Sequence, residues 1–517
     1  MRLTSLHIPK WKNLEDFRVK FSEESFTSVL VGRNATAKSN LLEALVVIFR
    51  DLDLGEPPAF AYQIEYTCRG QLVSIKADPE RVGSDSLHIL VGGNRIPIQQ
   101  FSRRGGGKSL PSNVFVYYSG HSDRMLSHFE KHEDQFDREL RAGRDQPLRP
   151  LLYISLLHSK FALLAFFWED DPNQRKFLQD YLRIQDLDSV LFVLKRPHWY
   201  SSARLKRGDP RFWGAVGVVR DLLDKLHQQS LAPLRRKASG TRGRSLDRLY
   251  LYLKDKRDLQ EFGRSYESGR EFFKALDSMH LADLVEDVRA RVVIKGVDSS
   301  LTFRELSEGE QQLLMVLGLL RFTREEESLI LLDEPDTHLN PAWSLNYVQL
   351  LNETVTKDYS SHVLMATHDP LVVAGLRADQ VHVMRRDQAG RVTGEHPERD
   401  PVGMGISGLL MSDVYGLRSE LDPETLEQLD LRRRLAIKEH LTPEEEENLR
   451  KLNIWVEEQD FTRTDRDPLY KRFVDAMTEW EHRHGLQKPR LSKEEQEEQK
   501  KKALEVIEKI KTEEVPK

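Results

Sequence analysis

Residues 31–40, Val-Gly-Arg-Asn-Ala-Thr-Ala-Lys-Ser-Asn, decide the fold of this chain. They nearly match the pattern G-x-x-x-x-G-K-[ST], in which backbone N–H groups surround phosphates, the lysine reaches the β and γ oxygens, and the hydroxyl holds Mg²⁺. Gly32, Lys38 and Ser39 keep the spacing of this pattern, but Ala37 takes the position of the second glycine. The stretch therefore predicts a phosphate loop that lacks one glycine.

The residues on either side of the loop fit a strand–loop–helix unit. Residues 26–31 are largely apolar and predict a short strand, and residues 41–50 predict a helix. Lys38 would then lie at a helix N-terminus, where unpaired N–H groups attract anions. The predicted nucleotide-binding residues are Gly32, Arg33, Asn34, Ala35, Thr36, Ala37, Lys38, Ser39 and Asn40.

A second motif, Leu-Ser-Glu-Gly-Glu-Gln at residues 306–311, has the LSxGE form of an ABC-type signature. Its serine and glycine are expected to cap a helix whose N-terminus points at the γ-phosphate of a nucleotide held by another head. Ser307, Glu308 and Gly309 would thus complete the site of a neighbouring protomer, which requires at least a homodimer.

Two apolar strands with polar ends follow. Residues 329–335, Leu-Ile-Leu-Leu-Asp-Glu-Pro, end in two carboxylates, and residues 363–369, Val-Leu-Met-Ala-Thr-His-Asp, end in a histidine. Asp333 and Ser39 are the predicted Mg²⁺ ligands, the aspartate acting through the water shell of the ion. Glu334 would polarise the attacking water, and His368 would sense the γ-phosphate.

Each motif alone also fits a plain structural role, such as a helix cap, a strand end or a surface histidine. Their shared order and length scale instead predict an ABC-type ATPase that binds ATP and Mg²⁺. Glu334 and His368 are its candidate catalytic residues.

Composition fits a cytoplasmic protein that does not enter a membrane. The chain has 517 residues and a net charge of -5, and Cys68 is its single cysteine. One cysteine cannot form an intrachain disulfide and suits a reducing compartment. The longest apolar stretch, residues 151–168, is interrupted by His158, Ser159 and Lys160, so it predicts a buried helix rather than a membrane span.

The order of patterns predicts an α/β fold in which an ABC-type P-loop NTPase head is split by a helical insertion. Residues 1–120 would form the N-terminal part of the head, and residues 121–290 a basic helical insertion. Residues 291–400 would complete the head. Residues 401–517 would form a helical C-terminal extension that binds a partner and ends in a charged tail.

Part of the insertion is strongly basic. Residues 195–248 contain 14 Lys/Arg and 4 Asp/Glu, with four aromatic residues among them at positions 199, 200, 212 and 213. Such residues can neutralise phosphates and stack on bases without reading sequence, although a solvated surface over an aromatic core explains them equally well. The nucleic-acid candidates are Arg235, Arg236, Lys237, Arg242 and Arg244.

Several stretches resemble known families. Lys-Ser-Asn at 38–40, Val-Tyr-Tyr-Ser-Gly at 116–120, Leu-Ser-Glu-Gly-Glu-Gln-Gln at 306–312, Asp-Glu-Pro-Asp-Thr-His-Leu-Asn-Pro at 333–341 and Ala-Thr-His-Asp at 366–369 resemble the ABC-type ATPases of bacterial antiphage defence. The broader relatives are the overcoming-lysogenization-defect and RecF-like heads. Residues 403–417 and 466–470 are similar to the PtuA family of the Septu systems. That resemblance implies an oligomeric ATPase that restrains a separate HNH nuclease while nucleotide is bound.

The chain departs from these families at the loop, where they carry glycine in place of Ala35 and Ala37. Glycine adopts positive φ freely, whereas alanine there costs on the order of 1 kcal/mol. We therefore expect ATP binding with slow or absent hydrolysis. No intrinsic nuclease motif is found, so a separate polypeptide would cut DNA.

Two alternatives stay open. One is a RecF/SMC-like DNA-repair ATPase that clamps DNA through the basic insertion. The other is a scaffold whose altered loop binds no nucleotide.

Overall fold

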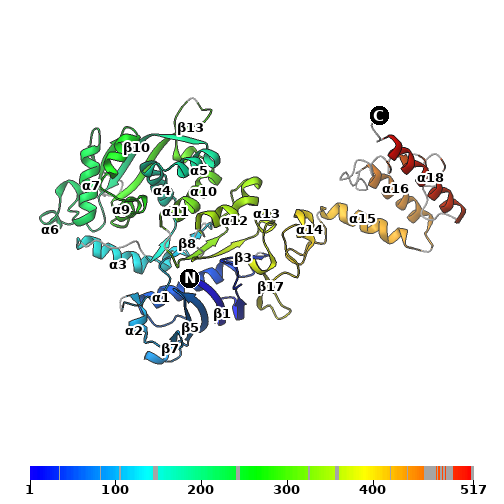
Figure 1. Cartoon of the computed structure of the whole chain (residues 1–517), viewed down its shortest axis with the longest axis horizontal. Helices are drawn as coiled ribbons and strands as arrows, with labels where there is room; N and C mark the ends of the chain where they lie inside the picture. Colours follow the sequence, from blue (N-terminus) through cyan, green and yellow to red (C-terminus); the bar gives the residue numbers. More distant parts are fainter. Residues whose placement is uncertain are drawn as a thin grey trace. The chain divides into compact units, whose positions relative to one another are not determined.

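The computed structural model describes residues 1–33, 35–81, 83–103, 106–120, 122–143, 150–239, 245–297, 299–323, 326–355, 360–419, 421–438, 440–458, 473, 476–477, 480, 484 and 493–513. The chain forms two compact units, Met1–Gly416 and Leu417–Lys517. The described part of the first unit contains three sheets. Figure 1 labels helices and strands of the chain and colours them from the N-terminus to the C-terminus.

A seven-stranded sheet forms the centre of the first unit. Its strand order is β18-β17-β3-β16-β15-β8-β9, and β18 pairs antiparallel with β17 while the other neighbours are parallel. The strands are β3 (Thr27–Gly32), β8 (Val114–Tyr118), β9 (Leu151–Tyr153), β15 (Leu329–Asp333), β16 (His362–Thr367), β17 (Val381–Arg386) and β18 (Val392–Glu395).

Both faces of this sheet are covered, as the uninterrupted apolar sequences of β15 and β16 require. Alternate side chains of one strand enter two different cores: Leu329 and Leu331 join one cluster, whereas Ile330 and Leu332 join the other. α1 (Lys38–Leu54) contributes one side of the first cluster. The sheet is therefore the layer that separates two hydrophobic cores.

A six-stranded antiparallel sheet packs against the same core as α1. Its strand order is β2-β1-β4-β5-β6-β7. The strands are β1 (Arg2–Trp11), β2 (Leu14–Lys20), β4 (Tyr62–Cys68), β5 (Gln71–Ala77), β6 (Leu87–Val91) and β7 (Asn94–Arg95), and the short helix α2 (Ile98–Phe101) follows them.

The insertion differs from the all-helical expectation, because it carries a five-stranded antiparallel sheet of order β11-β12-β10-β13-β14. The strands are β10 (Ile184–Lys195), β11 (Leu234–Ser239), β12 (Ser245–Leu253), β13 (Val285–Ile294) and β14 (Leu301–Thr302). β10 has an irregular burial pattern, and its pairing with β13 is interrupted by three register shifts. A bulged strand loses the two-residue alternation by which strands are recognised in sequence.

Helices make up the rest of the insertion and of the head. They are α3 (Glu130–Arg141), α4 (Leu156–Glu169), α5 (Pro172–Leu182), α6 (Ser202–Leu205), α7 (Gly217–Gln229), α8 (Lys256–Gly263), α9 (Gly269–Leu281), α10 (Glu308–Leu313), α11 (Leu319–Thr323), α12 (Pro341–Val355), α13 (Pro370–Val373) and α14 (Gly405–Met411).

The expected segment boundaries also shift. β9 belongs to the central sheet although it lies beyond residue 120, and β13 crosses residue 290 as part of the insertion sheet. The C-terminal unit begins at Leu417 rather than at residue 401, since α14 packs with α13 in the first unit. Long-range strand pairing and helix packing set these limits, and local composition does not record them.

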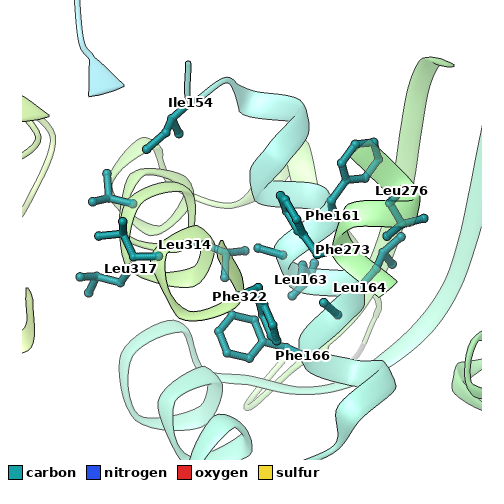
Figure 2. Close-up of a cluster of buried hydrophobic side chains, with 14 of the residues drawn as sticks. Ile154, Phe161, Leu163, Leu164, Phe166, Phe273, Leu276, Leu314, Leu317 and Phe322 are labelled. Carbon is teal, nitrogen blue, oxygen red and sulfur yellow. The ribbon is translucent and has the colours of Figure 1, made fainter. Parts of the chain in front are cut away.

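Helix α4 joins the insertion to the head through an apolar core. Figure 2 shows Phe161 and Phe166 of α4 among Phe273, Leu314 and Phe322, and the Phe166 and Phe322 ring centroids are 4.8 Å apart at 73°. The predicted buried stretch 151–168 is thus β9 followed by α4. Among the helices that the structure describes, none combines the length and the apolar character that a membrane crossing requires.

The signature helix continues through an irregular turn. α10 is followed by a π-helical segment, η7 (Leu314–Gly318), and then by α11. A π segment inserts an extra residue into a helix. Here it packs on α4, so the signature helix contacts the insertion directly.

The described part of the second unit includes helices α15 (Pro423–Ala436), α16 (Pro443–Glu458) and α18 (Lys493–Glu513). The start of α16 is capped: Thr442 precedes Pro443, and its hydroxyl accepts a hydrogen bond of 3.3 Å from the Glu445 N–H.

Candidate nucleotide-binding site

The loop between β3 and α1 holds two alanines in the left-handed region. Ala35 has φ 66° and Ala37 has φ 67°. Residues other than glycine rarely adopt this conformation because their Cβ approaches the backbone closely. Gly32 is required for a different reason, since a Cβ there would lie 2.5 Å from the Met384 carbonyl oxygen. The loop thus has glycine at position 32, where a side chain has no room, and alanine at positions 35 and 37, where the backbone has the positive φ that glycine favours.

Lys38 closes the loop on itself. Its Nζ donates to the Gly32 carbonyl oxygen at 2.7 Å, and the residue is only 7% exposed. Burial lowers the pKa of Lys38, while the nearby Glu334 and Asp333 carboxylates act in the opposite direction. A buried ammonium paired mainly with a carbonyl is suited to exchange that partner for a phosphate oxygen.

The register of the central sheet brings the motifs to one edge. Asp333 pairs with Tyr118 of β8 and with Ala366 of β16, and Ala366 pairs with Leu30 of β3. In a parallel sheet, strand ends of equal register lie side by side. The loop, the carboxylates and the histidine therefore share the carboxyl edge, as the sequence predicts.

Asp333 is 2% exposed, and burial raises the pKa of its carboxyl to about 6. The Ser39 hydroxyl opposes this shift. Neither Asp333 oxygen makes a hydrogen bond of ordinary geometry with any residue that the structure describes. A buried carboxylate without such partners is costly unless a cation or ordered water meets it. The positions of Ser39 and Asp333 therefore suit the predicted Mg²⁺ site. Mg²⁺ usually takes one or two protein oxygens and several waters as ligands.

Glu334 and His368 meet at the same edge. The His368 Nδ1 lies 3.2 Å from the Glu334 Oε1. Glu334 has φ 50°, and its N–H donates to the Ala366 carbonyl oxygen at 2.8 Å. Sparsely populated backbone conformations cluster at functional sites. The two predicted catalytic side chains are thus in contact, and the Glu334 backbone is held in a strained position.

The signature residues form the start of α10 and contact His338. Ser307 caps α10, and its hydroxyl donates to Glu310 at 2.7 Å. Glu308 is exposed and lies 3.2 Å from the His338 imidazole. Gly309 is buried against the His338 carbonyl, which a Cβ would approach to 2.5 Å.

Sequence reasoning missed Gln312, which ties this helix to the carboxylates. Its Nε2 donates to the Tyr117 hydroxyl at 3.1 Å and, more weakly, to the Glu334 carbonyl oxygen at 3.4 Å. Its Oε1 accepts from the His338 N–H at 3.2 Å. The second glutamine of the signature stretch was the available signal, because a polar residue on a buried helix face needs a partner.

A buried ion-pair network beside the loop was also missed. Glu43 of α1 accepts from Lys12 Nζ at 2.5 Å and contacts His128 Nε2 at 2.9 Å, and Arg124 donates to it as well. The side chain of Asn40, a predicted nucleotide-binding residue, accepts from Arg124 and donates to the Asn13 side chain at 2.5 Å. Asn40 therefore fixes the helix start in this structure.

The other loop residues are placed as follows. Arg33 accepts from the Thr36 hydroxyl at 2.7 Å through its carbonyl oxygen, so both residues hold the loop together. Asn34 lies outside the described residues.

The nucleic-acid candidates separate into different groups. The Arg235 side chain is 33% exposed but already paired, with hydrogen bonds of 2.9 and 2.7 Å to Asp247 and its guanidinium 4.8 Å from the Trp213 ring centre. Arg236 and Lys237 are exposed on β11, whereas Arg242 and Arg244 lie outside the described residues. Phe212 and Trp213 are buried, so they belong to the core and cannot stack on bases.

A parallel sheet with this loop, these carboxylates, a terminal histidine and a signature helix defines the ABC-type class of P-loop ATPase heads. Residues 28–374 match the family described as "AAA domain, putative AbiEii toxin, Type IV TA system". The chain belongs to this family.

One curated relative extends the likeness. The chain is 27% identical over 156 residues to Septu protein PtuA of Bacillus mycoides (strain KBAB4). The match covers 28% of this chain and 21% of that protein, so it spans about a fifth of the relative's length. The chain is an ABC-type ATPase that is similar to PtuA.

Solved structures that match this chain with low scores include two SMC heads. The head domain from Thermotoga maritima has a TM-score of 0.33 at 14% identity, covering 77% of this chain and 100% of that chain. The head derived from Pyrococcus furiosus, solved with an extended coiled coil and the C-terminal domain of ScpA, has a TM-score of 0.32 at 12% identity, covering 76% of this chain and 96% of that chain.

The Glu43 network predicts an acid-sensitive contribution to stability. Burial alone would raise the pKa of Glu43, but hydrogen bonds from His128, Lys12 and Arg124 outweigh it and lower the pKa to about 2 from 4.5. A depressed carboxyl pKa stabilises the fold above the unfolded value, and this contribution disappears as pH falls from 4.5 toward 2. We expect Glu43→Gln to lower the thermal unfolding midpoint at pH 7 and to flatten its fall on acidification.

The matched control is Glu80→Gln, which changes an exposed glutamate. Thermal midpoints of the three proteins at neutral and acid pH measure the effect. An unchanged slope in Glu43→Gln would contradict the assignment.

Proposed function

We propose that this chain binds ATP with Mg²⁺ and uses the nucleotide mainly as a structural ligand that controls assembly. One observation carries the proposal: a loop complete in Lys38 and Ser39 holds two alanines at positive φ. Such a loop keeps the charges that grip a triphosphate. It also places methyl groups where glycines would allow the closest approach of phosphate.

Each residue has a defined part in this binding. The Lys38 ammonium leaves the Gly32 carbonyl for the β and γ oxygens, and the N-terminus of α1 faces the phosphates. Ser39 and Asp333 would hold Mg²⁺, which neutralises phosphate charge when bound. Each side chain lies at the sheet edge described above.

Hydrolysis is proposed to be slow. Glu334 is the general base that polarises water, and His368 contacts both this carboxylate and the incoming γ-phosphate. Two alanines at positive φ cost roughly 1 kcal/mol each relative to glycine. That strain and the crowding by their methyl groups disfavour the tighter transition-state geometry more than ground-state binding.

The signature residues are proposed to act across a homodimer or a higher homo-oligomer. Ser307 and Glu308 are exposed at the start of α10, so a second head can meet them. Gln312 joins this helix to the loop that follows Glu334. Contact between heads at α10 can therefore change the position of the Glu334 carboxylate.

We further propose that the chain works in the cytoplasm with a separate HNH nuclease, which it restrains while ATP is bound. The similarity to Septu protein PtuA and the resemblance of residues 403–417 to that family support this role. The helical unit Leu417–Lys517 is the proposed docking region. Exposed Arg236 and Lys237 favour a second candidate function, a RecF/SMC-like clamp that binds DNA through the insertion.

Lys38→Ala tests nucleotide binding directly. We expect the unaltered chain to bind MgATP and Lys38→Ala to bind it at least about tenfold more weakly, since a charge-assisted contact to phosphate is lost. Equilibrium dialysis measures binding, and phosphate release measures turnover. Steady-state hydrolysis should be slow and should rise in the Ala35→Gly, Ala37→Gly double variant. Brisk turnover in the unaltered chain that Glu334→Gln abolishes would refute the structural-ligand proposal.

Ser307→Asp tests the contact between heads. Aspartate keeps the helix cap but places a negative charge toward the γ-phosphate of the other protomer. We expect ATP to drive the unaltered chain to a dimer or larger species by light scattering, and Ser307→Asp to remain monomeric with an unchanged thermal midpoint. Ser307→Thr is the conservative control. Assembly of Ser307→Asp at the level of the unaltered chain would contradict action in trans.

The control of a nuclease is testable with a candidate HNH nuclease produced together with this chain. We expect the two to co-purify and plasmid cutting to be suppressed by ATP with the unaltered chain but not with Lys38→Ala. DNA-stimulated hydrolysis without a nuclease partner would instead favour the DNA clamp.

A further inference from the structure

Arg386, the last residue of β17, holds the carbonyl of one of the strained alanines. Its Nη2 donates to the Ala35 carbonyl oxygen at 2.8 Å, and its Nη1 donates to the Gly390 carbonyl oxygen at 2.8 Å. β17 lies beside β3, with Met384 paired to Gly32. One guanidinium therefore bridges the phosphate loop and the β17–β18 turn.

The turn that carries Gly390 is itself firmly built. The Asp387 backbone N–H donates to the Arg391 carbonyl oxygen at 2.8 Å, and the Asp387 side chain accepts from Arg391 Nε at 2.9 Å. Gly390 supplies the positive φ, 82°, that the turn requires. Arg386 thus reaches the loop from a fixed support, and the planar fork of its guanidinium matches two carbonyls at once.

We propose that Arg386 is a positioning residue that keeps the alanine-bearing loop in the conformation that binds phosphate. This inference rests on the proposed nucleotide function. A peptide unit is planar and trans, so fixing the Ala35 oxygen fixes the direction of the Thr36 N–H, which donates to the Arg33 carbonyl oxygen at 3.3 Å. The Thr36 hydroxyl donates to the same Arg33 oxygen at 2.7 Å.

The reason for such a residue is the alanine itself. Glycine at position 35 would occupy the left-handed region without a Cβ penalty, whereas alanine returns toward negative φ unless another interaction opposes it. The hydrogen bond from Arg386 to the Ala35 oxygen is made with Ala35 at positive φ and so stabilises that conformation. Arg386 would therefore offset, in part, the departure of this loop from the glycine pattern.

Arg385 provides a matched control on the same strand. It is exposed like Arg386, but its guanidinium donates to the carbonyl of Asp413 and lies 3.7 Å from the carboxylate of that residue. Replacing either arginine removes one positive charge at neighbouring positions. Only Arg386 contacts the loop in these hydrogen bonds.

The experiment measures MgATP dissociation constants of the full chain by equilibrium dialysis. The variants are Arg386→Ala, Arg386→Lys and Arg385→Ala, together with Ala35→Gly alone and combined with Arg386→Ala. Because a hydrogen bond from a charged group contributes a modest net amount, we expect Arg386→Ala to weaken binding about fivefold to tenfold. Arg386→Lys should recover only part of the loss, since one ammonium cannot bridge both carbonyls in the same geometry. Arg385→Ala should stay within about twofold.

The Ala35→Gly background distinguishes loop positioning from general support. The loss caused by Arg386→Ala should become smaller there, because glycine no longer needs to be held. Equal losses in both backgrounds, or an Arg386→Ala affinity indistinguishable from Arg385→Ala, would overturn the inference. Lys38→Ala separates the two proposals: if the unaltered chain binds no better than Lys38→Ala, the proposed function fails and this inference fails with it.

Discussion

The central constraint on this structure is a parallel sheet buried on both faces. Every residue of β15 and β16 is buried, and their side chains alternate between the α1 core and the insertion core. Such strands can carry polar groups only where they end, because a charged side chain in mid-strand would enter a core unpaired. Asp333, Glu334 and His368 therefore lie at the carboxyl edge as a consequence of the packing.

That edge stores unfavourable energy in several places. Ala35, Ala37 and Glu334 all adopt positive φ, and the Asp333 carboxylate is buried without an ordinary hydrogen bond among the described residues. Arrangements of this kind persist only where the surrounding structure over-determines them. The sheet register, the Lys38 bond to Gly32 and the Arg386 bridge are the constraints that hold the loop.

The signature helix links the site to the rest of the molecule. At its start, Gly309 packs on the His338 backbone, and one turn later Gln312 bonds to Tyr117 and His338. It then passes into η7, whose Leu314 and Leu317 belong to the same core as Phe161 and Phe166 of α4 (Figure 2). A displacement of this helix would shift both the loop that follows Glu334 and the insertion, because packed cores transmit strain.

The sequence by itself determined the class of fold, the loop, the carboxylates, the histidine and the signature helix. Each of these depends on short spacings and on strands that are apolar throughout, so local order is sufficient to find them. Only the tertiary structure decided the insertion sheet, the pairing of Arg235 with Asp247, the hydrogen bonds of Asn40, and the contacts of Gln312, Glu43 and Arg386. These side-chain contacts join residues from 12 positions apart, as for Arg235 and Asp247, to 351 positions apart, as for Arg386 and Ala35. Hydrogen-bond partners across such distances are fixed by which strands lie side by side, and no local pattern in the sequence records that arrangement.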